Sequence, residues 1–329
     1  MGAFWYANYL MSPISDTPSP VTVEIPAGAG ASKIGERLQK AGVIRSGLAF
    51  TIMARLLGES SDMKSGEYRL PRNLGVVELI NQLVQGTNAE SQWVTIPEGK
   101  TLRQIANLLD EDRLARKDDF LRAAHRSPSV YGLDLPVRRS SVEGYLMPDT
   151  YKLPVKTNER KIVARLVSNW KNKVWSPNRA LFAKSDLPPD KVVILASMIE
   201  REARVPQDRP LISSVIRNRL KKKMKLQIDA TILYALGQHK NLVTFKDLKV
   251  DSLFNTYKYP GLPPAPICNP GLASIEAALQ PARSEYLYYV AKPDGSHIFT
   301  RTGQEHAAAV AKARALRQQA SAGDTAKQP

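Results

Sequence analysis

Apolar residues recur along this chain with two periods that predict different secondary structures. Alternation of apolar and polar residues predicts short strands in VTVEI and WVTI, at residues 21–25 and 93–96. Apolar residues spaced three and four apart predict amphipathic helices, and the stretch Lys191 to Arg204, KVVILASMIEREAR, runs directly into acidic residues. We therefore expect an α+β fold, with small β-α modules first and a mixed α/β domain built around this last helix.

An internal repeat organises the first part of the chain. The pattern I-P-x-G at residues 25–28 recurs at residues 96–99, an offset of 71 residues, and each copy joins a short β-run, a Pro/Gly turn and an amphipathic helix. Two helical stretches and a strand-like GEYRL lie between the copies. Such a unit resembles half of a LysM-type glycan-binding module, and it is equally well explained as a common β-α packing unit without a ligand.

The helix predicted over residues 191–204 carries two carboxylates near its end. At about 100° per residue, Glu202 continues the apolar stripe of Leu195, Met198 and Ile199, whereas Glu200 points in nearly the opposite direction. We expect Glu202 to be desolvated and its pKa raised, which suits a proton donor. The alternative is a helix end whose acids simply lie in water.

The composition excludes some kinds of site but does not identify one function. With 329 residues and 43% apolar content the chain can bury a core and divide into two or three domains. The single cysteine, Cys268, excludes an intramolecular disulfide and a cysteine-based metal site, and four scattered histidines without an H-E-x-x-H motif argue against any catalytic metal. A net charge of +16 favours a polyanionic partner, which could be nucleic acid, anionic lipid or a cell-wall polymer.

Several short motifs follow the E-x-E pair in a fixed order. They are N-R-L at 218–220, Q-x-D-x-T at 227–231, Y-A-L-G at 234–237, N-T-Y at 255–257, G-L-P-P-x-P-I-x-N-P-G at 261–271 and H-x-F at 297–299, with E-G-Y-L-x-P-D-T-Y upstream at 143–151. This order, which covers the chain from about Val21 to Phe299, closely resembles the endolytic murein transglycosylases. The resemblance implies a membrane-anchored lytic transglycosylase with a LysM-like N-terminal module.

The resemblance implies a carbon-oxygen lyase that cleaves the MurNAc-GlcNAc bond of nascent peptidoglycan strands and leaves 1,6-anhydroMurNAc ends. A glycosidase normally needs two carboxyl groups, but a lytic transglycosylase needs one, because the C6 hydroxyl of the substrate attacks its own anomeric carbon. Glu202 is therefore expected to act as the single general acid and base. A tethered hydroxyl has a high effective concentration, so no cofactor or metal is expected.

Polar residues downstream of the helix are the candidate substrate contacts. Gln227 and Asp229 alternate with apolar residues and would share one face of an extended segment, although Asp229 could equally be the N-cap of the next helix. The N-T-Y motif offers neutral groups that bind acetamido groups and sugar hydroxyls, or else a polar turn that braces the proline-rich loop. The expected substrate-binding set is Gln227, Asp229, Thr231, Asn255, Thr256 and Tyr257.

Two further motif residues are expected to be structural. A strand pattern at 286–291, a P-D-G turn and a second strand at 296–300 predict a hairpin that would bring His297 near the domain surface. We expect this histidine to be neutral and structural. Glu200 is expected to support the site or to lie on the surface.

The start of the chain is apolar but short. Residues 2–11, GAFWYANYLM, fall well below the roughly 20 residues that cross a bilayer. The resemblance implies a single-pass inner-membrane protein with its catalytic domain in the periplasm, so we expect this segment to be the outer end of an anchor; the alternative is a soluble protein with an apolar N-terminus. The expected domains are the anchor remnant and linker at 1–20, the LysM-like region at 21–135, the catalytic domain at 136–302, and a C-terminal helix with a mobile tail at 303–329.

The sequence leaves two other functions open. One is a non-catalytic peptidoglycan-binding scaffold of the cell-wall synthesis machinery, against which the motif set argues. The other is a nucleic-acid binder, which is disfavoured because the basic residues are dispersed and no nucleic-acid-binding motif stands out. The expected partners are therefore peptidoglycan glycan strands, candidate peptidoglycan synthases and the inner membrane, with no nucleic acid.

Overall fold

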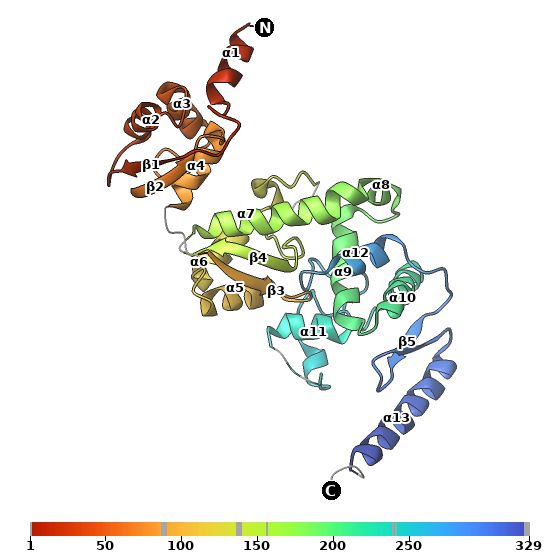
Figure 1. Cartoon of the computed structure of the whole chain (residues 1–329). Helices are drawn as coiled ribbons and strands as arrows, with labels where there is room; N and C mark the ends of the chain where they lie inside the picture. The colour runs from red at the N-terminus through yellow and green to blue at the C-terminus, as the bar shows by residue number, and fades with distance from the viewer. Residues whose placement is uncertain are drawn as a thin grey trace. The chain divides into compact units, whose positions relative to one another are not determined.

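The computed structural model describes residues 2–86, 91–135, 140–155, 157–238, 240 and 242–325. The chain divides into two compact units, one formed by residues 1–92 with 153–157 and the other by residues 93–152 with 158–329. Helices alternate with three two-stranded sheets, which confirms the α+β class (Figure 1). The last residues of the expected mobile tail, 326–329, lie outside the described residues.

The first unit is built on one antiparallel strand pair. Strand β1 (Pro20–Ile25) pairs with β2 (Gly66–Pro71) so that Val23 lies opposite Tyr68. Val23, Ile25, Tyr68 and Leu70 are all buried, because alternate side chains of both strands face the same core. The helices of this unit are α1 (Gly2–Met11), α2 (Ala31–Lys40), α3 (Gly47–Leu56) and α4 (Val76–Gln85).

Helices α2 and α3 cross at two glycines. A Cβ atom at Gly35 would lie 2.6 Å from the carbonyl oxygen of Gly47, so only glycine permits this approach of the two backbones. The first copy of the I-P-x-G repeat thus forms a strand, a turn and a helix within this unit, and the second copy does so in the other unit. The LysM-like character of these elements and the expected domain boundaries remain predictions.

The second unit begins with β3 (Ser91–Ile96), which pairs with β4 (Asp149–Pro154). A short antiparallel hairpin closes the unit: β5 (Tyr288–Ala291) pairs with β6 (His297–Thr300), as the sequence predicts. Its α-helices are α5 (Leu102–Glu111), α6 (Lys117–Ala124), α7 (Glu159–Trp170), α8 (Ser176–Lys184), α9 (Pro189–Glu202), α10 (Arg209–Lys221), α11 (Asp229–Leu236), α12 (Leu272–Leu279) and α13 (Gly303–Thr325). Shorter helical turns lie at η1 (Pro128–Tyr131), η2 (Lys171–Trp175), η3 (Pro206–Asp208) and η4 (Asp247–Lys249).

Helix α9 lies at the centre of the second unit (Figure 1). Every residue from Val192 to Ile199 is buried, because α10, α11 and α12 pack against this helix. Pro188 precedes the helix and Pro189 is its first residue. Proline suits this first position because it has no N–H that would need a partner. The helix ends at Glu202, so the carboxylate of its last residue lies at the edge of the buried core.

No helix within the described ranges combines the length and the apolar content needed to span a membrane. In α1, the side chains of Trp5, Tyr6 and Tyr9 are exposed.

Candidate active site

Glu202 is the last residue of α9, and two segments that follow it in the chain bind its carboxylate. Tyr289 of β5 donates its phenolic hydrogen to Oε2 of Glu202 over 3.0 Å. The backbone N–H of Ala230, in the first turn of α11, donates a second hydrogen bond to this carboxylate. Glu202 is partly buried, and these two donors fix the position of its carboxyl group.

The surroundings of Glu202 change its acidity. The pKa of this carboxyl group is raised to about 7, mainly by burial and also by the negative charge of Asp229, while the bonds from Tyr289 and Ala230 and the charge of Arg201 act in the opposite direction. A group with a pKa near neutrality is populated in both protonation states at physiological pH. It can therefore donate a proton in one step and accept one in the next.

Tyr289 is itself held by aromatic packing. The ring of His297, on the paired strand β6, meets the Tyr289 ring edge-on, with centroids 5.4 Å apart. Burial and the adjacent Glu202 charge raise the pKa of the Tyr289 phenol well above its usual value, so it stays protonated and acts as a donor. Reasoning from sequence missed Tyr289 as a site residue, and its place in the predicted strand was the available signal.

His297 does not lie where the sequence predicted. Its side chain is only 4% exposed, so the expectation that the hairpin brings it near the surface is wrong for the imidazole ring. Both its backbone N–H and its Nδ1 lie 2.8 Å from Oδ2 of Asp208, the residue just before α10. The hairpin folds its first β6 residue inward because this buried carboxylate gives it two hydrogen bonds.

Gln227 and Asp229 lie on the exposed side of the segment that leads into α11, while Ile228 between them is buried. Tyr257 donates to Oδ1 of Asp229 over 2.5 Å, which joins two of the candidate residues directly. Gln227 has a positive φ of 55°, which turns the chain sharply before the helix. The N-cap interpretation of Asp229 is wrong: α11 begins at Asp229 itself, and Ile228 takes the cap position.

Three of the six candidate substrate contacts are buried and use their polar atoms within the fold. The hydroxyls of Thr231 and Thr256 are 2.9 Å apart, and Thr256 also accepts from the N–H of Ile228. Asn255 donates to two backbone carbonyls over 2.9 and 2.8 Å. These three residues brace the loop, and the members of the expected set that lie at the surface are Gln227, Asp229 and Tyr257; the substrate-binding role of all six stays a prediction.

Arg219, from the N-R-L motif, joins the same region from α10. It donates to the carbonyls of Leu287 and Leu226, over 2.6 and 2.8 Å, and its guanidinium lies 5.0 Å from the Tyr288 ring centroid. It thus connects the hairpin to the segment that carries Gln227. The sequence offered this motif as part of the resemblance but gave no reason to place the arginine near Glu202.

Glu200 has different neighbours from Glu202. Its Oε2 accepts from the backbone N–H of Gly271 over 3.0 Å, at the end of the proline-rich loop. The carboxyl group of Glu98 also lies against Gly271, in the space that a Cβ atom at this position would occupy. The geometry gives Glu200 a structural contact with the loop, and its role in activity stays a prediction.

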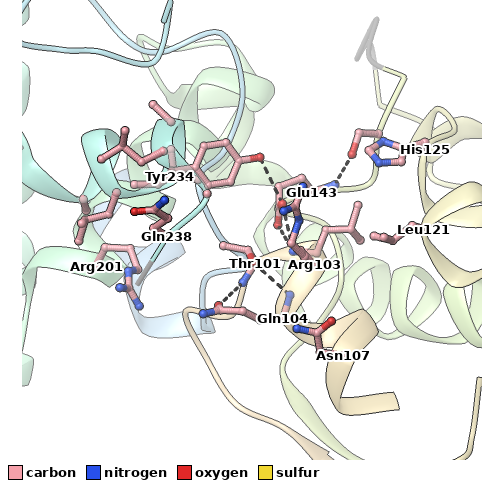
Figure 2. A pocket seen from close by; sticks show the side chains of 18 residues that line it. Thr101, Arg103, Gln104, Asn107, Leu121, His125, Glu143, Arg201, Tyr234 and Gln238 are labelled. Atoms are coloured by element: carbon pink, nitrogen blue, oxygen red, sulfur yellow. Dashed lines mark hydrogen bonds between the residues drawn. The ribbon is translucent and has the colours of Figure 1, made fainter. Parts of the chain in front are cut away.

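A pocket of about 600 Å³ lies beside this site, between α5, α6 and α11 (Figure 2). Glu202 does not line it, but Arg201 and Ala230, which flank the Glu202 carboxylate, do. Glu143, from the upstream motif, lies at its wall and is 6% exposed. Both Glu143 oxygens accept from the N–H of Leu102, the first residue of α5.

Burial raises the pKa of Glu143 to about 8, although hydrogen bonds from Leu102, Tyr234 and Asn269 lower it in part. This carboxyl group is therefore mostly protonated at neutral pH. Asn269 donates to Glu143 and also accepts from the N–H groups of Gly144 and Leu146. Glu143 therefore belongs to a buried polar network that fixes the segment around it.

Among the described residues, no group of three or more histidine, cysteine or acidic side chains is arranged to hold a metal ion.

Comparison with known proteins gives consistent results. The model of the YceG-like family matches residues 23–312. A curated protein of Bacillus subtilis named endolytic murein transglycosylase is 36% identical over 318 residues, which cover 93% of this chain and 88% of that protein. A protein of the same name from Streptococcus pneumoniae is 33% identical and aligns with 92% of this chain and 60% of its own length. The crystal structure of a YceG-like protein from Listeria monocytogenes superposes with a TM-score of 0.61 at 34% identity, covering 88% of this chain and 99% of that one.

Proposed function

Because this chain belongs to the YceG-like family, we propose that it cuts nascent peptidoglycan strands at the MurNAc-GlcNAc bond with Glu202 as its single acid and base. Its match to curated murein transglycosylases over nine tenths of its length makes it a lytic transglycosylase that acts on peptidoglycan. The proposal adds the reacting residue and the product. The observation that carries it is the Glu202 carboxyl group, held by Tyr289 and Ala230 at a pKa of about 7.

The reaction needs one proton to travel in each direction. Protonated Glu202 gives its proton to the glycosidic oxygen, the bond from that oxygen to C1 of MurNAc breaks, and the GlcNAc hydroxyl leaves. The C6 hydroxyl of the same MurNAc then forms a bond to C1 and returns its proton to the Glu202 carboxylate. The products are a 1,6-anhydroMurNAc end and the restored acid. Because the nucleophile belongs to the substrate, no second carboxylate is needed for attack.

Exposed polar groups near Glu202 can orient the sugar. Tyr257 and Asp229 form one hydrogen-bonded pair next to the acid, and Gln227 lies on the same exposed side of its segment. Amide, phenol and carboxylate groups of this kind bind acetamido groups and hydroxyls. The buried residues Thr231, Asn255 and Thr256 hold the loop that carries this pair.

The cellular setting is also a proposal. An N-terminal anchor in the inner membrane would hold the catalytic unit in the periplasm, close to strands as they are made, and would bring it near peptidoglycan synthases. The aromatic side chains exposed on α1 suit the headgroup region of a bilayer and support this arrangement. Fractionation of cells that express the full reading frame tests it, since recovery of the product in the cytosol alone would contradict it.

Mass spectrometry of nascent glycan strands incubated with the purified chain tests the reaction itself. Anhydro-ended fragments from within the strand are expected. Fragments with reducing ends would identify a hydrolase that uses water, and the absence of any cleavage would favour the scaffold function.

A further inference from the structure

The pocket beside Glu202 is positively charged. Two arginines line it, Arg103 in the first turn of α5 and Arg201 at the end of α9. Among the described residues that line it, the only acidic side chain is Glu143, which is buried, accepts hydrogen bonds from Leu102 and Asn269, and has a pKa raised to about 8 by burial. The other lining residues, such as Asn107, carry no negative charge. The two arginines are therefore not matched by an exposed carboxylate among the described residues that line the pocket.

The fold does not use these two guanidinium groups for ion pairing. Among the described residues neither arginine forms a salt bridge, and Arg201 makes one long hydrogen bond, 3.5 Å to the carbonyl of Gly99. Arg217 and Arg219, by contrast, each donate to backbone carbonyls of neighbouring segments. The exposed side chain of Arg103 is therefore available to an outside group.

The pocket borders the reacting carboxyl group. Ala230 lines the pocket and also donates its N–H to Glu202, and Arg201 is the residue before Glu202. In Figure 2, Arg201 and Gln238 lie on one side of the pocket, His125 and Leu121 lie on the other, and Arg103 and Tyr234 lie between them. A group bound here would thus be attached to a sugar close to the bond being broken.

We propose that this pocket binds a carboxylate of the peptide stem on the muramic acid next to the scissile bond, with Arg103 as its principal partner. This rests on the proposed function. The sugars of the glycan strand are neutral, whereas each intact stem carries free carboxylates, so an uncompensated cationic pocket fits the stem and not the sugar backbone. Arginine is suited to this task because its guanidinium group binds a carboxylate through two parallel hydrogen bonds. A volume of about 600 Å³ accommodates a short peptide.

The test compares glycan strands that carry intact stems with the same strands after their stem carboxylates have been converted to amides, because removing the stems with an amidase would leave a new carboxylate on each muramic acid. For Arg103→Glu we expect KM on stem-bearing strands to rise about tenfold or more, with kcat nearly unchanged, because a charge-assisted pair is replaced by repulsion. On the amidated strands the variant should match the parent. Folding of the variant is not at risk, since an acidic residue in the first turn of a helix is favourable.

Two controls separate charge from position and binding from catalysis. Arg116→Glu makes the same charge change outside the pocket, at a side chain that is 86% exposed. It should leave KM and kcat on both kinds of strand unchanged. Direct binding of the strands to the Glu202→Gln protein, with and without the Arg103→Glu change, measures the pocket without turnover. Stem-bearing strands whose carboxylates have been converted to amides should bind both proteins equally.

Equal losses on the stem-bearing and the amidated strands, or no loss on either, would overturn the assignment. Because the binding comparison does not depend on cleavage, it distinguishes failure of this inference from failure of the proposed reaction.

Discussion

Tyr289 and Glu202 are joined by a 3.0 Å hydrogen bond that links the C-terminal hairpin to the central helix of the second unit. The two residues are 87 positions apart. Through this bond the hairpin sets the position of the carboxyl group and part of its acidity. The Asp208–His297 contact and the edge-on packing of His297 against Tyr289 hold the hairpin in turn.

Removing the Glu202 acid should stop strand cleavage. In Glu202→Gln the side chain keeps its size but has no proton to give, so anhydro-ended products should fall by at least about a hundredfold, the usual contribution of a general acid. Product counting by mass spectrometry measures this. Glu200→Gln is the matched control and should keep much of the activity, because Glu200 binds the Gly271 N–H instead. The reverse pattern would transfer the catalytic role to Glu200.

The pH dependence of kcat/KM should show an alkaline limb near pH 7, where Glu202 loses the proton that it must donate. Tyr289→Phe should move this limb to higher pH. The Tyr289 bond lowers the pKa of Glu202 by stabilising its charged form, and its loss raises that pKa. Tyr288→Phe, on the neighbouring position of the strand, makes no bond to Glu202 and should leave the profile in place. A shift in the acidic direction for Tyr289→Phe would contradict the arrangement.

Asp229→Asn should move the same limb in the opposite direction. The negative charge of Asp229 raises the pKa of Glu202, so neutralising it should lower that pKa and shift the limb to lower pH. An asparagine oxygen can still accept from Tyr257, which limits structural change. Profiles of the variant and the parent, measured on the same strands, give the shift. An unchanged limb would mean that the two carboxyl groups are not electrostatically coupled.

The free energy of unfolding should fall as the pH rises toward 8, because the folded protein holds the Glu143 carboxyl group in its neutral form. Its pKa is about 8 in the fold against its ordinary value of 4.5 in the unfolded chain, so its contribution to stability is complete below about pH 4.5 and is lost as the pH rises through 8. The change is of the order of a few kcal/mol. Glu143→Gln should flatten the pH dependence of Tm between pH 5 and 8, with a smaller slope left by Glu202. Parallel curves for the two proteins would show that Glu143 does not titrate in this range.

Local patterns predicted the elements that hold the site. The period of apolar residues in KVVILASMIEREAR predicted α9 nearly to its last residue. It also placed Glu200 and Glu202 on different sides of the helix, where they have different partners. The strand pattern and the P-D-G turn gave the β5–β6 hairpin. These features follow from residues near one another in the chain, which is why periodicity detects them.

Contacts between distant segments could not be predicted in this way. The pairing of Tyr289 with Glu202 depends on how the hairpin docks against α9, which no local pattern records. Asn255 and Thr256 have the composition of a polar surface turn, yet both are almost fully buried because backbone groups around them need partners. His297 was predicted near the surface for a similar reason: its buried partner, Asp208, lies 89 residues earlier.

The order of these residues along the chain also affects when the acid becomes competent. Glu202 is synthesised before both of its hydrogen-bond donors, Ala230 and Tyr289. As a chain grows from its N-terminus, α9 is complete well before β5 exists, and the carboxyl group has no phenol to hold it. A nascent or truncated chain that ends before the hairpin would therefore carry the acid without the bond that positions it. The carboxyl group would thus reach its final position and acidity only after nearly the whole second unit has been made.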